Sequence, residues 1–112
     1  MATPPNRIEL ELEYCGIWAR GHHVHEGFVV SAGSEVRDVE NPSLRKNIKA
    51  LRADLLARGV VVPIAGVKDR LRFQVAWTFF SPAVAAKFVT GAHVAATKWV
   101  RLRTPAPIAR AE

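Results

Sequence analysis

The chain contains a single cysteine in 112 residues, so no internal disulfide can form. Small secreted domains commonly depend on several disulfides, and structural zinc sites usually need more than one thiolate. Cys15 has no obvious base partner, and we interpret it as a small apolar residue of the core. The cysteine content favours a reducing compartment, and we expect the protein to be cytoplasmic.

Long apolar runs are also lacking. Arg, Glu, Lys or Gly interrupts every apolar stretch, and none approaches the roughly 20 residues that span a bilayer. Residues 1–5 do not show the charged-then-apolar pattern of a signal peptide. We therefore expect no membrane partner.

Catalytic motifs are missing as well. The sequence has no Walker-type phosphate loop, no GxSxG, no HExxH and no carboxylate pair in a plausible active-site setting. His22, His23 and His25 lie close together, but only Glu26 accompanies them as a further ligand type. A small enzyme or metal protein using these histidines is the lowest-ranked hypothesis. We expect no catalytic residue, no metal site and no cofactor.

Acidic residues are outnumbered by basic ones. Sixteen Lys and Arg against ten Asp and Glu give a net charge of +6, which favours polyanionic partners such as nucleic acid. The alternative is that these charges only keep the protein soluble. The apolar content of 49% is typical of a globular protein. We expect one domain over residues 8–103, between a flexible tip (1–7) and a disordered Pro-containing tail (104–112).

Alternating apolar residues predict several short strands. In residues 8–14 apolar side chains alternate with Glu9, Glu11 and Glu13, which predicts a strand with an acidic solvent side. Residues 17–20 predict a second strand, residues 21–27 a polar turn holding the three histidines, and residues 28–32 the returning strand. Further strands are predicted near residues 60–62, 71–75 and 98–103.

Residues 43–59 predict one long helix, with Ser43 as N-cap and Gly59 after its last turn. Apolar residues recur at helical spacing and are expected to face the sheet. Four basic residues form a stripe beside that apolar face, which is either a solvated surface or a phosphate-binding one. They are Arg45, Lys46, Lys49 and Arg52.

Residues 81–91 predict a second, short helix with Ser81 as N-cap, Pro82 at the first position and Gly91 at its end. The free backbone N–H groups at the start of this helix make the N-terminus at Ser81 a candidate anion-binding site. The aromatic residues just before it could form a stacking platform for single strands, but we favour their burial in the core. The predicted fold class is α+β: a small antiparallel sheet of five or six strands with one long and one short helix packed against it.

Several segments together resemble a known family. They are residues 27–30 with Gly33-Ser34, Ser43-Leu44 and Leu51-Arg52 with Leu55 and Gly59, Phe80-Ser81-Pro82 with Ala85-Ala86, Val89 and Gly91, and Trp99. Over residues 13–101 the chain resembles a domain-of-unknown-function family that occurs C-terminal to GIY-YIG nuclease and other restriction-modification proteins. Its last part is also similar to the RAMA domain (restriction enzyme and adenine methylase associated).

The resemblance implies an accessory role in DNA recognition, including sensing of modified DNA, in a restriction-modification context. The chain departs from the family pattern at one position and in one segment. Ala83 stands where a second Ser is usual, and residues 92–96 replace a polar Arg-Ser-x-Asn-Gly segment before the Trp. The sequence shows no nuclease or methylase domain, so we expect the module to act alone, to form a homodimer, or to dock onto a nuclease or methylase as a partner protein.

Our leading hypothesis is a non-enzymatic module that binds duplex DNA, with Trp99 near a groove or a flipped base. The alternative is a protein-interaction or homodimerisation domain with no nucleic-acid role. The first gains if the basic residues share one surface, and the second gains if they scatter. The expected DNA-binding residues are Arg45, Lys46, Lys49, Arg52, Lys98, Trp99, Arg101 and Arg103.

Overall fold

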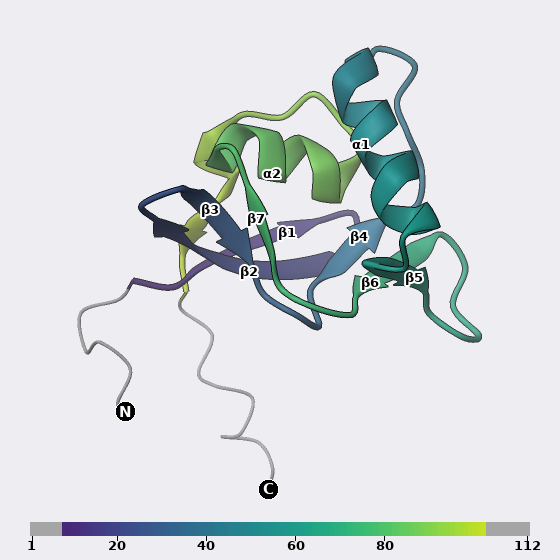
Figure 1. Ribbon diagram of the computed structural model, residues 1–112, viewed down its shortest axis with the longest axis horizontal. Helices are drawn as coiled ribbons and strands as arrows, with labels where there is room; N and C mark the ends of the chain where they lie inside the picture. Colours follow the sequence, from purple (N-terminus) through teal and green to yellow (C-terminus); the bar gives the residue numbers. More distant parts are fainter. Residues whose placement is uncertain (1–7, 103–112) are drawn as a thin grey trace, which may run out of the picture.

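Two antiparallel sheets and two helices form the computed structural model, which describes residues 8–102 (Figure 1). The larger sheet has the strand order β7-β3-β2-β1-β8, and the smaller has the order β4-β6-β5. The strands are β1 (Leu10–Tyr14), β2 (Ile17–Val24), β3 (Gly27–Val30), β4 (Glu35–Arg37), β5 (Val61–Pro63), β6 (Arg70–Phe73), β7 (Trp77–Phe79) and β8 (Val100–Arg101). The helices are α1 (Lys46–Ala57) and α2 (Pro82–Thr90), with a 3-10 turn η1 (Ala96–Lys98).

The α+β class is thus confirmed, but the strands divide into a five-stranded and a three-stranded sheet where we expected a single one. The predicted tip (1–7), the tail (104–112) and Arg103 lie outside the described residues. No helix within residues 8–102 is long and apolar enough to cross a membrane.

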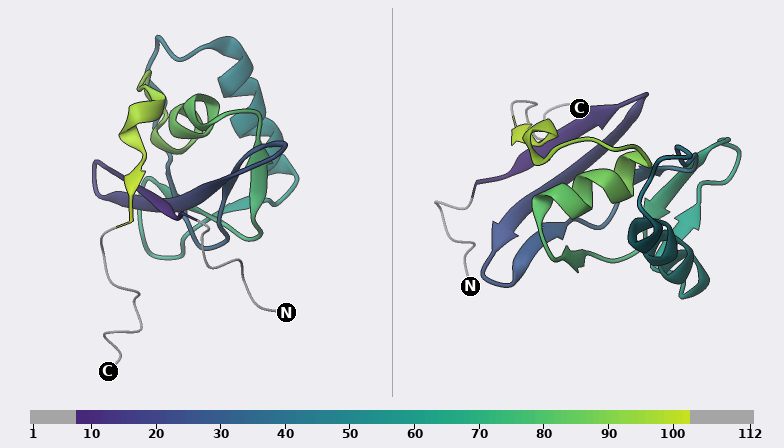
Figure 2. Two further views of the ribbon diagram at one scale, coloured as in Figure 1. Left: turned by 90° about the vertical axis from the view of Figure 1, so that its left-hand side faces the viewer. Right: turned by 90° about the horizontal axis from the view of Figure 1, so that it is seen from above.

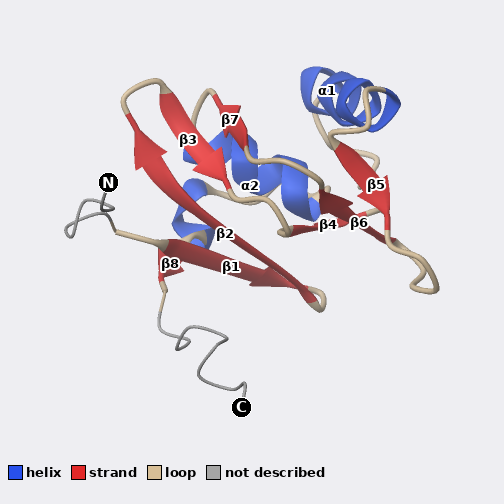
Figure 3. Cartoon of the chain, turned by 60° about the horizontal axis from the view of Figure 1, so that its bottom comes forward, coloured by secondary structure: helices blue, strands red, loops and turns tan. Residues whose placement is uncertain are grey.

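Helix α2 covers one face of the larger sheet, and α1 packs beside α2 next to the smaller sheet (Figure 2). Leu12 of β1 lies opposite Ala19 of β2, and both are fully buried, as is Phe28 of β3. Helix α2 lies behind the larger sheet in Figure 3, and within residues 8–102 no helix covers the face of this sheet that is turned to the viewer. One apolar core therefore connects both sheets and both helices.

Strand β1 corrects two predictions about its polar residues. Glu11 was expected on an acidic solvent side, yet it is buried because it accepts a 2.9 Å hydrogen bond from the indole Nε1 of Trp18 on the neighbouring strand. Cys15 was expected in the core, but it is exposed in the turn between β1 and β2, where its φ is +47°. Glu13, in contrast, is exposed as predicted.

The predicted turn over residues 21–27 is wrong. Strand β2 continues to Val24, and the turn is reduced to residues 25 and 26. Gly21 was expected to begin this turn. It serves packing instead, because a Cβ there would collide with the Phe28 ring. His22 and His23 consequently lie within the β2–β3 ladder, opposite Val29 and Phe28.

Helix α2 begins and ends as predicted. The Ser81 hydroxyl accepts a 3.2 Å hydrogen bond from the Val84 N–H, and Pro82 occupies the first helical position. Gly91 ends the helix with a φ of +68°, a left-handed conformation that favours glycine. A Cβ on Gly91 would also collide with the backbone carbonyl of Val39, so the site requires glycine for two reasons.

Helix α1 begins at Lys46, three residues later than predicted, and Ser43 does not cap it. The Asn41 N–H donates to the Gly91 carbonyl (2.8 Å), and the Leu44 N–H donates to the Asn41 carbonyl (3.0 Å). This turn places Leu44 in the core, and the helix therefore begins after it. The other end is as predicted, since Gly59 closes α1 in a left-handed conformation.

The predicted final strand over residues 98–103 is shorter than expected. Residues 96–98 form η1, and only Val100 and Arg101 pair with β1. The reason is Trp99, whose indole Nε1 donates a 3.0 Å hydrogen bond to the Pro82 carbonyl at the start of α2. That contact draws the chain toward α2 and away from the sheet edge.

Candidate nucleic-acid interface

The expected DNA-binding residues lie on two separate parts of the fold. Arg45, Lys46 and Lys49 are at the start of α1, whereas Lys98 and Arg101 belong to η1 and β8. Helix α1 and the η1–β8 segment stand at opposite ends of the molecule's long dimension (Figures 1 and 2). The main-chain segments that carry the two groups of basic residues are therefore separated in the fold.

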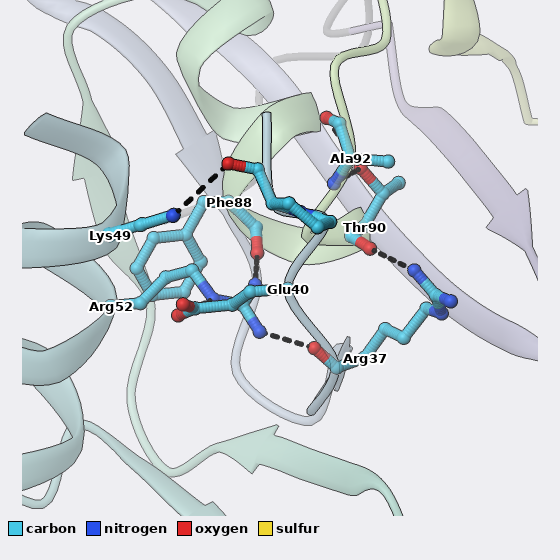
Figure 4. Close-up of polar contacts among 8 residues, drawn as sticks. Arg37, Glu40, Lys49, Arg52, Phe88, Thr90 and Ala92 are labelled. Atoms are coloured by element: carbon cyan, nitrogen blue, oxygen red, sulfur yellow. Dashed lines mark hydrogen bonds and ion pairs between the residues drawn. The ribbon is translucent and has the colours of Figure 1, made fainter. Parts of the chain in front are cut away.

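Arg52 is not part of an exposed stripe, which corrects the prediction for this residue. Its side chain is only 6% exposed, and it joins three elements (Figure 4). Its Nε donates to a Glu40 carboxylate oxygen at 3.0 Å, and its two terminal nitrogens donate to the carbonyls of Phe88 and Arg37. The guanidinium carbon also lies 5.7 Å from the centre of the Phe88 ring. Arg52 thus fastens α1 to α2 and to the end of β4.

Burial lowers the pKa of the Arg52 guanidinium, while the hydrogen bond to Glu40 acts in the opposite direction. A guanidinium remains cationic under these conditions, because its ordinary pKa is far above neutral. Arg52 is therefore a buried charge that needs its three oxygen acceptors. It is not available to a phosphate.

Trp99 is buried as well. Its side chain is 6% exposed, and its ring centre lies 4.8 Å from that of Phe28 in the core. In this position the Trp99 ring packs in the core, and little of it is exposed for the contact with a groove or a flipped base that the sequence suggested. Of the three aromatic residues just before α2, Phe79 is buried as expected and Trp77 is half-buried. Phe80 corrects the prediction, because it is 87% exposed.

Two of the three cations at the start of α1 are exposed. Arg45 holds the N-cap position without a side-chain capping bond, and the first turn contains no acidic residue. Arg45 and Lys46 are exposed, and Lys49 is half-buried with its Nζ donating to the Pro42 carbonyl at 3.3 Å. We call Arg45, Lys46 and Lys49 the α1 basic cluster.

Within residues 8–102, the ion pairs involve Arg20, Arg52, Arg58 and Arg70 and none of the α1 basic cluster. Positive side chains near a helix N-terminus are disfavoured, because that end of the helix dipole is itself positive. The two carboxylates that flank the cluster in sequence, Glu40 and Asp54, are paired with Arg52 and Arg58. The cluster is thus a concentration of positive charge that the described protein does not neutralise.

A second basic group, not predicted from the sequence, surrounds the β1–β2 turn. Arg37 and Lys98 each lie 5.6 Å from the centre of the Tyr14 ring, and Arg70 lies close over Gly16. These residues come from elements far apart in sequence, so the group as a whole gave no signal. Lys98 was an expected DNA-binding residue, and Arg70 belongs to the alternation of basic residues in β6. Arg37 donates to the Thr90 carbonyl (3.2 Å), and Arg70 lies 3.9 Å from a carboxylate oxygen of Glu35. Two of these three cations are therefore already engaged.

Two further candidate sites were considered. The Ser81 hydroxyl is occupied by its capping bond to Val84, so any anion there would have only backbone N–H groups of α2. Within residues 8–102, no group of three or more His, Cys, Asp or Glu side chains could hold a metal ion. The α1 basic cluster therefore remains a candidate charged site, with Arg45 and Lys46 exposed.

A family model described as Domain of unknown function (DUF4357) matches residues 10–102. The match covers every strand and helix of the described structure. No curated protein and no solved structure matches the chain. The chain therefore belongs to the DUF4357 family of domains of unknown function.

Proposed function

We propose that this protein is a non-enzymatic accessory module that binds duplex DNA through backbone phosphates. The observation that carries the proposal is the α1 basic cluster, three cations without ion pairs at a helix end that disfavours them. Such an arrangement is unfavourable for folding alone, and an anionic partner gives it a purpose. The net charge of +6 supports the same class of partner.

Phosphate contacts of this kind set affinity and position without reading sequence. Arg45 offers a forked guanidinium, Lys46 a flexible ammonium, and the first N–H groups of α1 add to the positive potential. Two or three phosphates held in this way give a slope of log affinity against log salt of about −2 to −3.

The finer parts of the proposal depend on the family resemblance. The similarity to the RAMA domain supports adenine-methylated DNA as a ligand, in a restriction-modification context and in the cytoplasm. It also supports a nuclease or methylase as the protein partner, because the proposed module has no catalytic activity of its own.

The test is fluorescence anisotropy with short duplexes, plain and adenine-methylated, across a salt series. We expect the double variant Arg45→Glu/Lys46→Glu to lose more than about tenfold in affinity and to show a slope shallower by about 2. The control Lys68→Glu/Arg72→Glu makes the same change in net charge at exposed positions outside α1. Equal losses in both variants, or no binding by the wild type at low salt, would sink the proposal.

A protein-interaction role without nucleic acid is the second candidate. It is favoured by the separation of α1 from the η1–β8 segment, which scatters the basic residues (Figure 2). In that case the variants above would leave every DNA measurement unchanged, and the cations would serve solubility.

A further inference from the structure

One of the two edges of the larger sheet is formed by β7, which pairs on one side only, with β3. No described element lies beyond β7 in Figure 3. Main-chain groups on the free side of an edge strand can pair with another strand. The edge is therefore a template for strand addition.

The register shows which groups point outward. The Ser31 N–H donates to the Arg20 carbonyl at 2.8 Å, and in an antiparallel ladder bonded positions alternate. Val29 therefore bonds toward β2, and its neighbours on β3 bond toward β7. Since Val29 lies opposite Thr78, the N–H and C=O of Thr78 are directed away from the sheet.

The usual protections of an edge strand are weak here. Natural edges often carry Lys, Pro or a bulge, but residues 73–86 contain no charged residue and β7 contains no proline. Two apolar side chains beside the edge are exposed, Phe80 at 87% and Val75 at 52%. Only the shortness of β7, three residues, limits pairing.

We propose that β7 pairs antiparallel with β7 of a second copy of this chain, joining the two larger sheets across a two-fold axis at Thr78. Thr78 and the partner's Thr78 would exchange both main-chain bonds, as in a hydrogen-bonded antiparallel pair. One position further along, Trp77 would face the partner's Phe79. The large, exposed Phe80 would then face the small, exposed Ala76 of the partner subunit.

Charge argues for a second copy as the occupant. Each copy carries +6, so two copies repel unless they meet where charge is lacking, and residues 73–86 are such a segment. The contact is small, which predicts a weak dimer with a dissociation constant in the micromolar range or above. The charges next to β7 are those of Arg58, whose guanidinium lies 5.4 Å from the centre of the Trp77 ring, and of Asp54, with which Arg58 forms an ion pair. Because these two charges offset each other, added salt should change the dimer little. This inference does not depend on the proposed DNA binding.

Sedimentation velocity over a concentration series tests the proposal on the full chain. We expect the wild type to dimerise and Phe80→Lys to lower the association constant at least about tenfold, because it places a charge in each half of the contact. Val100→Lys is the matched control, since Val100 is 44% exposed on β8, the opposite edge of the same sheet, and should leave the dimer unchanged.

A second variant addresses the main chain directly. Thr78→Pro removes the outward N–H and should also give monomers, while proline is tolerated where an edge N–H faces solvent. Circular dichroism checks that each variant folds. A wild type that stays monomeric at every concentration, or equal effects of Phe80→Lys and Val100→Lys, would overturn the proposal.

Discussion

The two helices begin in opposite ways. Helix α2 starts with a serine cap, a proline at the first position and no charged residue in its first turn. Helix α1 starts at Arg45 without a side-chain cap, beside Lys46 and Lys49. The first arrangement follows local preferences for a helix start, and the second opposes them.

The contrast shows that α1 is stabilised mainly by side chains packed against other elements. Helix α2 is stabilised by such packing and also by its N-terminal cap. Arg52, Leu55 and Ile48 are buried on α1, and Arg52 ties the helix to Phe88 and Arg37 by hydrogen bonds. Tertiary contacts can thus offset an unfavourable start. Places where a sequence opposes its own local preferences are commonly functional, which is the basis of our DNA-binding proposal.

The largest expected effect comes from removing the anchor of α1. Arg52→Ala should lower the free energy of unfolding by about 3 to 5 kcal/mol, because the carbonyls of Phe88 and Arg37 lose their donor and a cavity remains. Arg45→Ala, at an exposed site without a capping bond, should change it by less than about 0.5 kcal/mol. Urea unfolding followed by circular dichroism measures both. Similar values for the two variants would show that α1 does not depend on this network.

Two serine-to-alanine substitutions, one at the observed cap of α2 and one at the predicted cap of α1, should differ by an intermediate change in the free energy of unfolding. Ser81→Ala should lower the free energy of unfolding by about 1 kcal/mol, because the Val84 N–H loses its acceptor. Ser43→Ala should change it by less than about 0.5 kcal/mol, because the exposed Ser43 does not cap α1. Thermal unfolding of both variants is the measurement, and a larger loss for Ser43→Ala would contradict the observed helix start.

The smallest expected effect is an increase in stability. Lys46→Glu places a carboxylate at the first position of α1 and should raise the free energy of unfolding by about 0.3 to 1 kcal/mol at low salt. The gain should shrink in high salt, since screening weakens the dipole interaction. Lys68→Glu, outside any helix, serves as the control in the same urea titration and should show no such gain. A loss of stability in Lys46→Glu would mean that the cation is structurally required.

Local signals predicted much of the fold. The serine, proline and glycine of α2 and the terminal glycine of α1 act within one turn, so their effect is visible in sequence. The start of α1 was not predictable, because the bond from Asn41 to Gly91 joins residues 50 positions apart. Gly21 was misread for a similar reason, since its role depends on the ring of Phe28 across the strand pair.

The candidate site was predicted only in part. Helical spacing placed Arg52 next to the other basic residues of α1, but spacing cannot show that Phe88, Arg37 and Glu40 converge on it. Trp99 was singled out because it belongs to the family motif. The motif does not show that its indole N–H donates a hydrogen bond to the Pro82 carbonyl at the start of α2. The cations around Tyr14 depend on contacts among four elements, which no single stretch of sequence contains.

The most direct test of the central claim measures stability and DNA affinity together in Arg45→Glu/Lys46→Glu. If the start of α1 is kept basic for a polyanion, this variant should be at least as stable as the wild type and bind duplex DNA more than about tenfold more weakly. Unchanged affinity in a folded, equally stable protein would contradict the account and assign these cations to solubility.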